Sequence, residues 1–193
     1  MASMIEELIR KNRTYRRFYE DAPIERAQLE AWIDLARHTS SGGNLQSLKY
    51  VLSADKEKNA LIFPHLRWAG YLRDWPGPVE GERPSAYVVM LLDKTISSNP
   101  SWDHGLACQS ILLGAVEKGF GGCMFGAIDR KGLAQALDIL EQYEILLVMA
   151  LGKPKEVVVL EELADPKNVK YWRDEQGVHH VPKRKLEDLI LPY

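Results

Sequence analysis

The segment that most restricts the fold is a stretch of helix length, residues 102–118, with almost no polar face. Its apolar residues cover most of the circumference of a helix: Leu106, Ala107, Ile111, Leu112, Leu113, Ala115 and Val116. A helix that is apolar nearly all round is buried in a core or at a subunit interface. A continuous apolar run, 87–92, is typical of a strand buried on both faces, and residues 144–151 predict another buried strand. The chain therefore needs a large apolar interior built from both helix and sheet.

Composition limits the class of protein. The chain has 193 residues, 46% of them hydrophobic and 27% charged, which fits one soluble globular domain. A net charge of -2 argues against a dedicated nucleic-acid binder. No apolar run approaches the roughly 20 residues that span a bilayer, and the acidic N-terminus lacks the apolar core of a signal peptide. We therefore expect a cytoplasmic protein with no membrane partner.

Cysteine and histidine offer no metal site. The two cysteines, Cys108 and Cys123, exclude a disulfide scaffold and a cysteine-rich zinc site, and we expect both to be apolar core residues. No spacing among the histidines gives a metal-binding face, so each is expected in the core or on the surface. His179 and His180 fall in a predicted strand, where their side chains would point to opposite faces.

The order of the remaining elements indicates an α/β or α+β sandwich. A capping box, Ser3 to Glu6, predicts a helix running to about Asn12. Further patterns predict helices at 29–36, 56–63 and 129–137, a strand at 50–52, a hairpin of 169–173 with 178–181, and a short C-terminal amphipathic helix with Leu186, Leu189 and Ile190. Residues 67–83 are aromatic and rich in Pro and Gly, which predicts a long irregular segment.

Four clusters carry groups that suit a ligand. Residues 12–18 offer guanidinium groups and a hydroxyl for an anion, although charge alone favours a solvated basic face. Residues 40–46 offer small residues and polar side chains, with a plain loop as an equal alternative. Residues 119–127 are glycine-rich, which fits either backbone N–H groups facing a flat ligand or close packing. Residues 182–185 form a second cationic group, which could also be a solvated patch.

Taken together and in this order, the four clusters resemble the FMN-dependent nitroreductase family over essentially the whole chain. The resemblance implies an α+β sandwich around a mainly antiparallel sheet, and an intertwined homodimer with two FMN sites at its interface. Segment 102–118 is similar to the dimer-core helix of that family. We expect one domain, 1–193, whose C-terminal arm, 155–193, contributes to the dimer and to the phosphate site.

The resemblance also implies which residues bind the cofactor. The first basic motif supplies Arg13, Thr14 and Arg16 to the phosphate, the ribityl chain and the pyrimidine edge of the flavin. A loop that reaches FMN from the partner subunit matches Ser40, Ser41, Asn44 and Gln46. Phe125, Gly126 and Ala127 fall where the backbone approaches flavin N5 and O4. The phosphate-binding pair near the end of the chain matches Lys183 and Lys185, with Arg184 as an alternative to either. Two departures from the family pattern stand in this sequence: Asn12 replaces a basic residue, and Ser47-Leu48 replaces Pro-Trp.

The expected activity is that of an FMN-dependent NAD(P)H oxidoreductase acting by ping-pong hydride transfer. Its acceptors would be nitroaromatics, quinones or other flat electron-poor molecules, and the chemistry would lie on flavin N5 with no catalytic side chain. Trp68, Tyr71 and Trp75 are candidates for a substrate-side lid, with simple surface packing as an equal alternative. A flavin-binding protein without nicotinamide-dependent reduction, acting in FMN storage or oxygen-dependent flavin chemistry, is the alternative function. A cofactor-free structural protein of the same fold is a further one.

Overall fold

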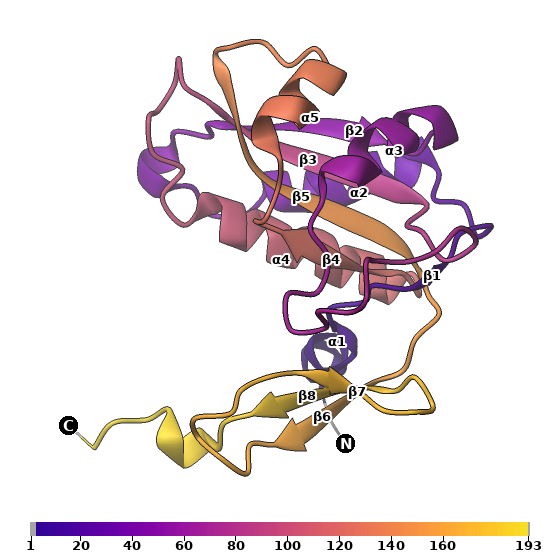
Figure 1. Cartoon of the computed structure of the whole chain (residues 1–193). Helices are drawn as coiled ribbons and strands as arrows, with labels where there is room; N and C mark the ends of the chain where they lie inside the picture. The colour runs from indigo at the N-terminus through magenta and orange to yellow at the C-terminus, as the bar shows by residue number, and fades with distance from the viewer. Residues whose placement is uncertain (1–2, 193) are drawn as a thin grey trace.

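The centre of the protein is a five-stranded sheet in which every strand pairing is antiparallel. The computed structural model describes residues 3–192. Strands β1, β5, β3 and β2 follow one another across the sheet, and β4 pairs with β5 beside β1. Their bounds are β1 Phe18–Tyr19, β2 Leu48–Ser53, β3 Ala86–Asp93, β4 Gly121–Phe125 and β5 Tyr143–Pro154. This sheet and the helices on it confirm the predicted α+β sandwich (Figure 1).

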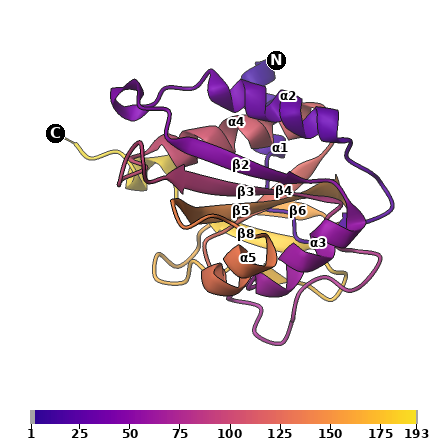
Figure 2. The same ribbon diagram turned by 90° about the horizontal axis from the view of Figure 1, so that it is seen from above.

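Helices cover both faces of the sheet, as Figure 2 shows with α2 and α4 on one side and α3 and α5 on the other. Their bounds are α1 Met4–Lys11, α2 Arg26–Arg37, α3 Lys56–Ile62, α4 Asp103–Glu117 and α5 Arg130–Ala136. All eight residues of β3 are buried, because alternate side chains enter two different cores. Val88 and Met90 pack with α2 and α4, whereas Tyr87 and Val89 pack in the core that includes Ile62.

The helix α4 is buried on two sides within this chain. One side packs on the sheet, and another packs so closely on α2 that a Cβ on Gly114 would lie 2.6 Å from Leu35 and 2.9 Å from Trp32. Its N-terminal end still carries exposed apolar side chains, since Trp102 is 82% and Leu106 is 45% exposed. The apolar pattern of residues 102–118 therefore exceeds what one chain buries.

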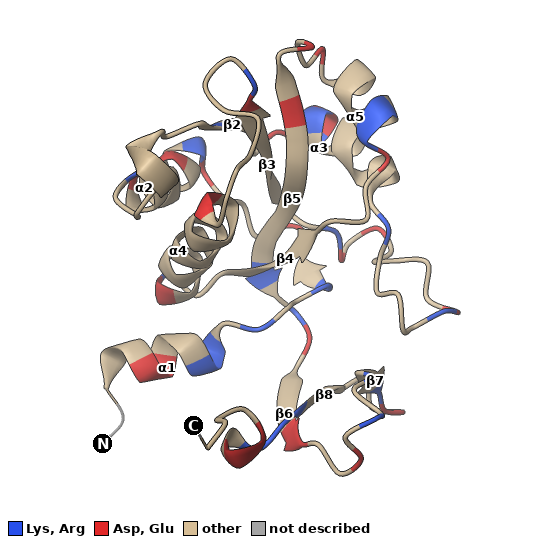
Figure 3. Cartoon of the chain, turned by 90° about the vertical axis from the view of Figure 1, so that its left-hand side faces the viewer, with Lys and Arg blue, Asp and Glu red and all other residues tan. Residues whose placement is uncertain are grey.

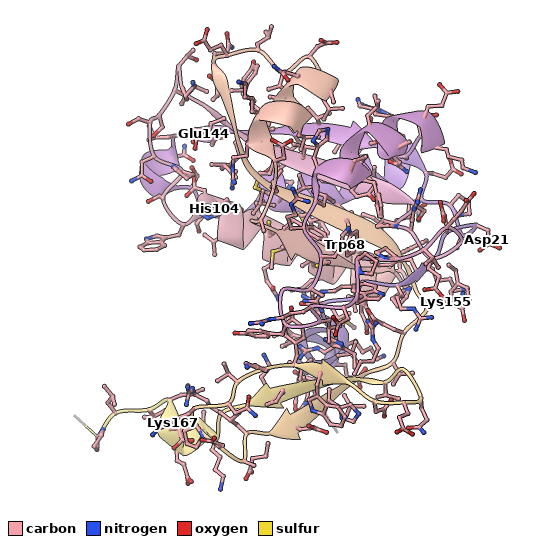
Figure 4. The ribbon with its side chains drawn as sticks, in the orientation of Figure 1. Asp21, Trp68, His104, Glu144, Lys155 and Lys167 are labelled. Atoms are coloured by element: carbon pink, nitrogen blue, oxygen red, sulfur yellow. The ribbon has the colours of Figure 1, made fainter. Side chains whose placement is uncertain are left out.

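The C-terminal arm begins at residue 155, and its described part carries a small sheet of its own. Its strands are β6 Val158–Glu162, β7 Trp172–Arg173 and β8 His179–Lys183, in the order β6-β8-β7. The antiparallel β7–β8 pair confirms the predicted hairpin, and β6 adds to β8 in parallel. In Figure 1 this sheet lies apart from the main sheet, with α1 between them. Lys155 lies where the chain leaves the core, and Lys167 lies in the arm (Figure 4).

The glycine-rich residues 121–125 form strand β4, and the glycines let this strand pack tightly against its neighbours. One sequence prediction about local structure needs correction. The predicted C-terminal helix is only a 3-10 turn, Leu186–Asp188, and Leu186, Leu189 and Ile190 are all exposed. A short helix depends on tertiary burial of its apolar face, and these side chains have none in this chain. Among the described residues, no helix is both long and apolar enough to cross a membrane.

Candidate functional site

A cavity of about 310 Å³ lies between the core and the arm. Four parts of the chain meet there: the segment after α1, the middle of α4, the strand β4, and the arm. The lining residues used below are Asn12, Arg13, Thr14, Arg16, Gln109, Leu112, Gly122, Tyr171, His179 and Lys183. The cavity therefore brings the first and the fourth predicted clusters together across most of the sequence.

The first basic motif reaches this cavity because it runs beside β4. Thr14 forms a parallel bridge with Gly122, and the backbone N–H of Tyr15 donates to the Gly122 carbonyl at 3.0 Å. A Cβ on Gly122 would lie 2.5 Å from the carbonyl oxygen of Ala150, so only glycine allows this close approach. The alternation of an extended chain then separates the two neighbouring arginines. Arg16 lines the cavity, whereas Arg17 pairs with Glu82 at 2.5 Å.

Three cations facing the cavity have no carboxylate partner among residues 3–192: Arg13, Arg16 and Lys183. Figure 3 shows Lys and Arg on the segment that leads from α1 to the sheet. The guanidinium of Arg13 donates only to the Ile9 carbonyl, at 2.7 Å, and its Nε is buried without a partner. Burial lowers the pKa of Arg13, although an arginine stays charged at neutral pH. The cavity is thus suited to an anion.

The other two predicted C-terminal cations do not line this cavity. Lys185 pairs with Glu162 at 3.2 Å on the surface of the arm. Arg184 donates to the carbonyl of Pro166 at 3.1 Å. Of the three, Lys183 alone therefore shares a cavity with the first basic motif.

Arg16 is only 8% exposed and is held from several sides. Its backbone N–H donates to the carboxylate of Glu156, and its Nη1 lies 3.2 Å from Nε2 of His179. The ring of Tyr171 lies under its guanidinium, with 4.7 Å from Cζ to the ring centroid. Burial, followed by the charge of Arg16, lowers the pKa of His179 to about 4. The imidazole is therefore neutral at pH 7, and its Nε2 accepts from Arg16.

Glu156 is a residue that the sequence did not indicate. Its side chain is fully buried, and it accepts from the backbone N–H groups of Arg16 and Arg17 and from the Arg173 guanidinium, the last at 2.9 Å. One carboxylate thus joins the arm to the basic motif. No sequence pattern predicts this, because Glu156 and Arg16 are 140 residues apart.

The second cluster, residues 40–46, lines a separate cavity of about 250 Å³ at the N-terminal end of α4. The hydroxyl of Ser41 donates to Asp103 at 2.6 Å and accepts from the backbone N–H of Gln46 at 2.9 Å. The backbone N–H of Gly42 donates to the other Asp103 oxygen at 2.8 Å. These bonds hold a loop in which Asn44 and Gln46 have positive φ, a costly conformation for residues other than glycine. Within one chain, Ser40, Ser41 and Gln46 therefore do not meet Arg13 and Arg16.

In the glycine-rich cluster, residues 119–127, some residues are closely packed and others have a backbone that is open to a ligand. Gly121 and Gly122 pack closely, since a Cβ on Gly121 would lie 2.5 Å from the Tyr15 ring. Gly126 has open space around its Cβ position and is exposed, as is Ala127. Phe125 is buried in the core. Of the three predicted residues Phe125, Gly126 and Ala127, the last two are therefore open to a ligand.

In the aromatic segment, residues 67–83, Trp68 has a different environment from Tyr71 and Trp75. Trp68 is buried against Phe125, with ring centroids 4.6 Å apart, and a Cβ on Gly77 would meet its ring at 2.7 Å. Trp68 therefore packs in the core of this chain rather than at its surface (Figure 4). Tyr71 and Trp75 lie nearer the surface and contact the arm, with 4.9 Å between the rings of Tyr71 and Tyr171.

The fold and the cavity define an antiparallel α+β sandwich with a cation-lined cleft between its core and a C-terminal arm. The sequence profile of the nitroreductase family matches residues 9–75 and 85–153, so the chain belongs to that family. Membership places the protein among oxidoreductases. No curated protein matches the sequence significantly.

Solved structures show the same fold. A nitroreductase family protein from Streptococcus pneumoniae is 14% identical, with a TM-score of 0.67 over 97% of this chain and 98% of the other. Nitroreductase A from Vibrio parahaemolyticus is 26% identical, with a TM-score of 0.61 over 80% and 69%. An FMN-dependent nitroreductase from Clostridium difficile is 20% identical, with a TM-score of 0.60 over 83% and 91%.

Proposed function

We propose that the protein is a homodimeric FMN-dependent oxidoreductase that takes electrons from NAD(P)H and reduces flat electron-poor acceptors such as nitroaromatics and quinones. One observation carries the proposal. Three cations without carboxylate partners among residues 3–192 face one cavity of a nitroreductase fold. Like charges that lie close together repel one another, so the convergence of three unpaired cations favours an anionic ligand.

The donors present fit FMN. Arg13 and Lys183 would bind the phosphate by charge-assisted hydrogen bonds, and the hydroxyl of Thr14 suits the ribityl chain. Arg16 would lie at the pyrimidine edge, where a guanidinium stabilises negative charge that builds up on reduction. The open backbone at Gly126 can donate an N–H. Asn12 also lines the cavity and adds an uncharged amide in place of a basic residue.

A second copy of the chain would complete the site. The cavity with Arg13 lies at Gln109 and Leu112 of α4, whereas the loop with Ser40 and Asn44 lies at the N-terminal end of that helix. One chain therefore holds two separated halves of the expected cofactor site. Exposed apolar side chains also gather on α1 and on the start of α4, which supports a dimer interface: Met4, Ile5, Ile9, Trp102 and Leu106.

Bound FMN would supply the redox chemistry, accepting a hydride and passing electrons to the acceptor. The chain itself binds, orients and tunes. Arg16 is held in place by Glu156, His179 and Tyr171, so its charge stays fixed against the cavity. His179 is neutral and accepts from Arg16, so it serves here to orient a cation rather than to deliver a proton. We assign no acid or base among these side chains.

The test is the visible spectrum of the purified protein, before and after FMN is added. We expect bound flavin that NADH or NADPH bleaches under anaerobic conditions, and a dimer in sedimentation. A protein that stays colourless with added FMN would contradict the proposal. Bound flavin that neither nicotinamide bleaches would favour the alternative, a flavin-binding protein without reductase activity.

A further inference from the structure

The arm contacts the aromatic segment through two side chains, Tyr171 directly before β7 and Arg173 within it. The ring of Tyr171 packs on Tyr71 at 4.9 Å, and the guanidinium of Arg173 lies over the ring of Trp75, 4.7 Å from its centroid. Trp172, between them, points to the opposite face and stacks on His180 at 4.1 Å. This is the period-two alternation of an extended chain. Two successive inward positions of the arm therefore touch one loop.

The same two side chains also contact the basic motif. Tyr171 lies 4.7 Å from the guanidinium of Arg16 and 5.1 Å from the ring of His179. Arg173 is bound to the buried carboxylate of Glu156, which accepts from the backbone N–H of Arg16. Tyr171 and Arg173, together called the arm clasp, thus join a loop to the residues that line the cation-rich cavity.

The loop itself has few other ties near its tip. Within residues 69–75, the backbone hydrogen bonds outside helices and strands are two internal turns, Leu72 to Ala69 and Trp75 to Leu72. The backbone N–H of Tyr71 also donates to the Tyr171 hydroxyl at 3.4 Å, a long and weak bond. Ring packing by the arm clasp is therefore a major restraint on where Tyr71 lies.

We propose that the arm clasp is a positioning device that holds the 69–75 loop against the cleft and thereby limits the size of the acceptor that reaches the cofactor. This rests on the proposed function. Tyr71 is 48% exposed, so displacing the tip of the loop at Tyr71 uncovers little of the core, and the clasp is the main contact that opposes it. A loosened loop would admit multi-ring acceptors more readily than single-ring ones.

The experiment compares Tyr171→Leu with Trp172→Leu, the same kind of change one residue along and on the opposite face. The first readout is trypsin cleavage after Arg73, followed by mass spectrometry. An aromatic pair is worth about 0.5–1.5 kcal/mol, so cleavage should accelerate roughly two- to tenfold in Tyr171→Leu, since proteolysis follows the open population. Trp172→Leu should leave it unchanged, and Tyr171→Phe, which keeps the ring, should behave like the wild type.

The second readout is kcat/KM for riboflavin, a three-ring acceptor, divided by that for p-benzoquinone, with FMN content measured for each variant. We expect this ratio, measured on the flavin-loaded fraction of each variant, to rise by about the same factor in Tyr171→Leu. Equal cleavage in both leucine variants, or faster cleavage with an unchanged ratio, would each overturn the proposal. If the wild type binds no flavin, the proposed function fails, and cleavage after Arg73 still decides whether the clasp holds the loop.

Discussion

Replacing Lys183 by alanine should weaken FMN binding far more than replacing Lys185, two positions along the chain. Lys183 lines the cavity with Arg13 and has no carboxylate partner among residues 3–192, whereas Lys185 pairs with Glu162. A hydrogen bond to a charged group contributes about 1.5–3 kcal/mol. Lys183 is exposed, so the lower value applies, and about 1.4 kcal/mol is a tenfold change in Kd. We therefore expect roughly tenfold weaker binding for Lys183→Ala.

Lys185→Ala is the matched control. Its ion pair is exposed, with 47% and 68% of the two side chains accessible, and such pairs contribute about 0–1 kcal/mol to stability. Its effect on FMN affinity should stay below about twofold, because that charge does not line the cavity. Both variants replace a lysine by alanine, so a difference in FMN affinity between them reports whether the lost charge lines the cavity.

The assay is quenching of FMN fluorescence on titration with flavin-free protein, repeated with riboflavin, which lacks the phosphate. For riboflavin the two variants and the wild type should bind alike. Added salt should reduce the difference in FMN affinity between Lys183→Ala and the wild type, because it screens the charge of Lys183. An equal or larger loss in Lys185→Ala, or the same loss for riboflavin as for FMN, would refute the assignment of Lys183 to the phosphate.

Three further predictions follow from the packing. Glu156→Gln should lower the free energy of unfolding by about 3 kcal/mol in urea titrations. The reason is that a fully buried carboxylate, which joins the arm to the segment before β1, loses its charge. A decrease of less than about 1 kcal/mol would contradict this. The folded-state pKa of His179 is about 4, below the ordinary 6.5, so its stabilising contribution is complete above pH 6.5 and is lost as the pH falls through 4. His179→Gln should therefore flatten the acid side of the stability curve, and an unchanged slope would count against a neutral buried imidazole. Gly121→Ala should cost about 1–3 kcal/mol in thermal unfolding because its Cβ would meet the Tyr15 ring, whereas Gly126→Ala, in open space, should cost almost nothing; equal effects would disprove the packing argument.

Local patterns in the sequence predicted local structure well. Ser3 accepts from the backbone of Glu6, and Asp129 caps α5, as their positions indicated. The hairpin at 172–183 and the buried β3 also follow from patterns spanning a few residues. Such features depend on neighbours in the chain, so a sequence displays them directly.

The prediction was weaker wherever a residue depends on a distant partner. The glycines of β4 were ambiguous because both a ligand and a neighbouring strand can require a missing Cβ. Asp103 and Glu156 showed no pattern, since their partners lie 61 and 140 residues away. For Trp68 the sequence left a lid and simple packing as equal alternatives, because aromatic residues in an irregular segment look alike whether they face inward or outward.

The sequence by itself determined the type of fold and identified the cationic and polar segments, because apolar periodicity and residue type can be read from neighbouring positions in the chain. Only the tertiary structure decided which of those groups meet. It places Lys183 in one cavity with Arg13 and Arg16, and it pairs Lys185 with Glu162 and Arg17 with Glu82. It leaves the 40–46 loop at the N-terminal end of α4, away from that cavity. The physical reason is that the pairing of a charge depends on distances across the folded chain. Residues 12–16 and Lys183 become neighbours only when the arm packs against the segment before β1, where Glu156 accepts from the backbone of Arg16.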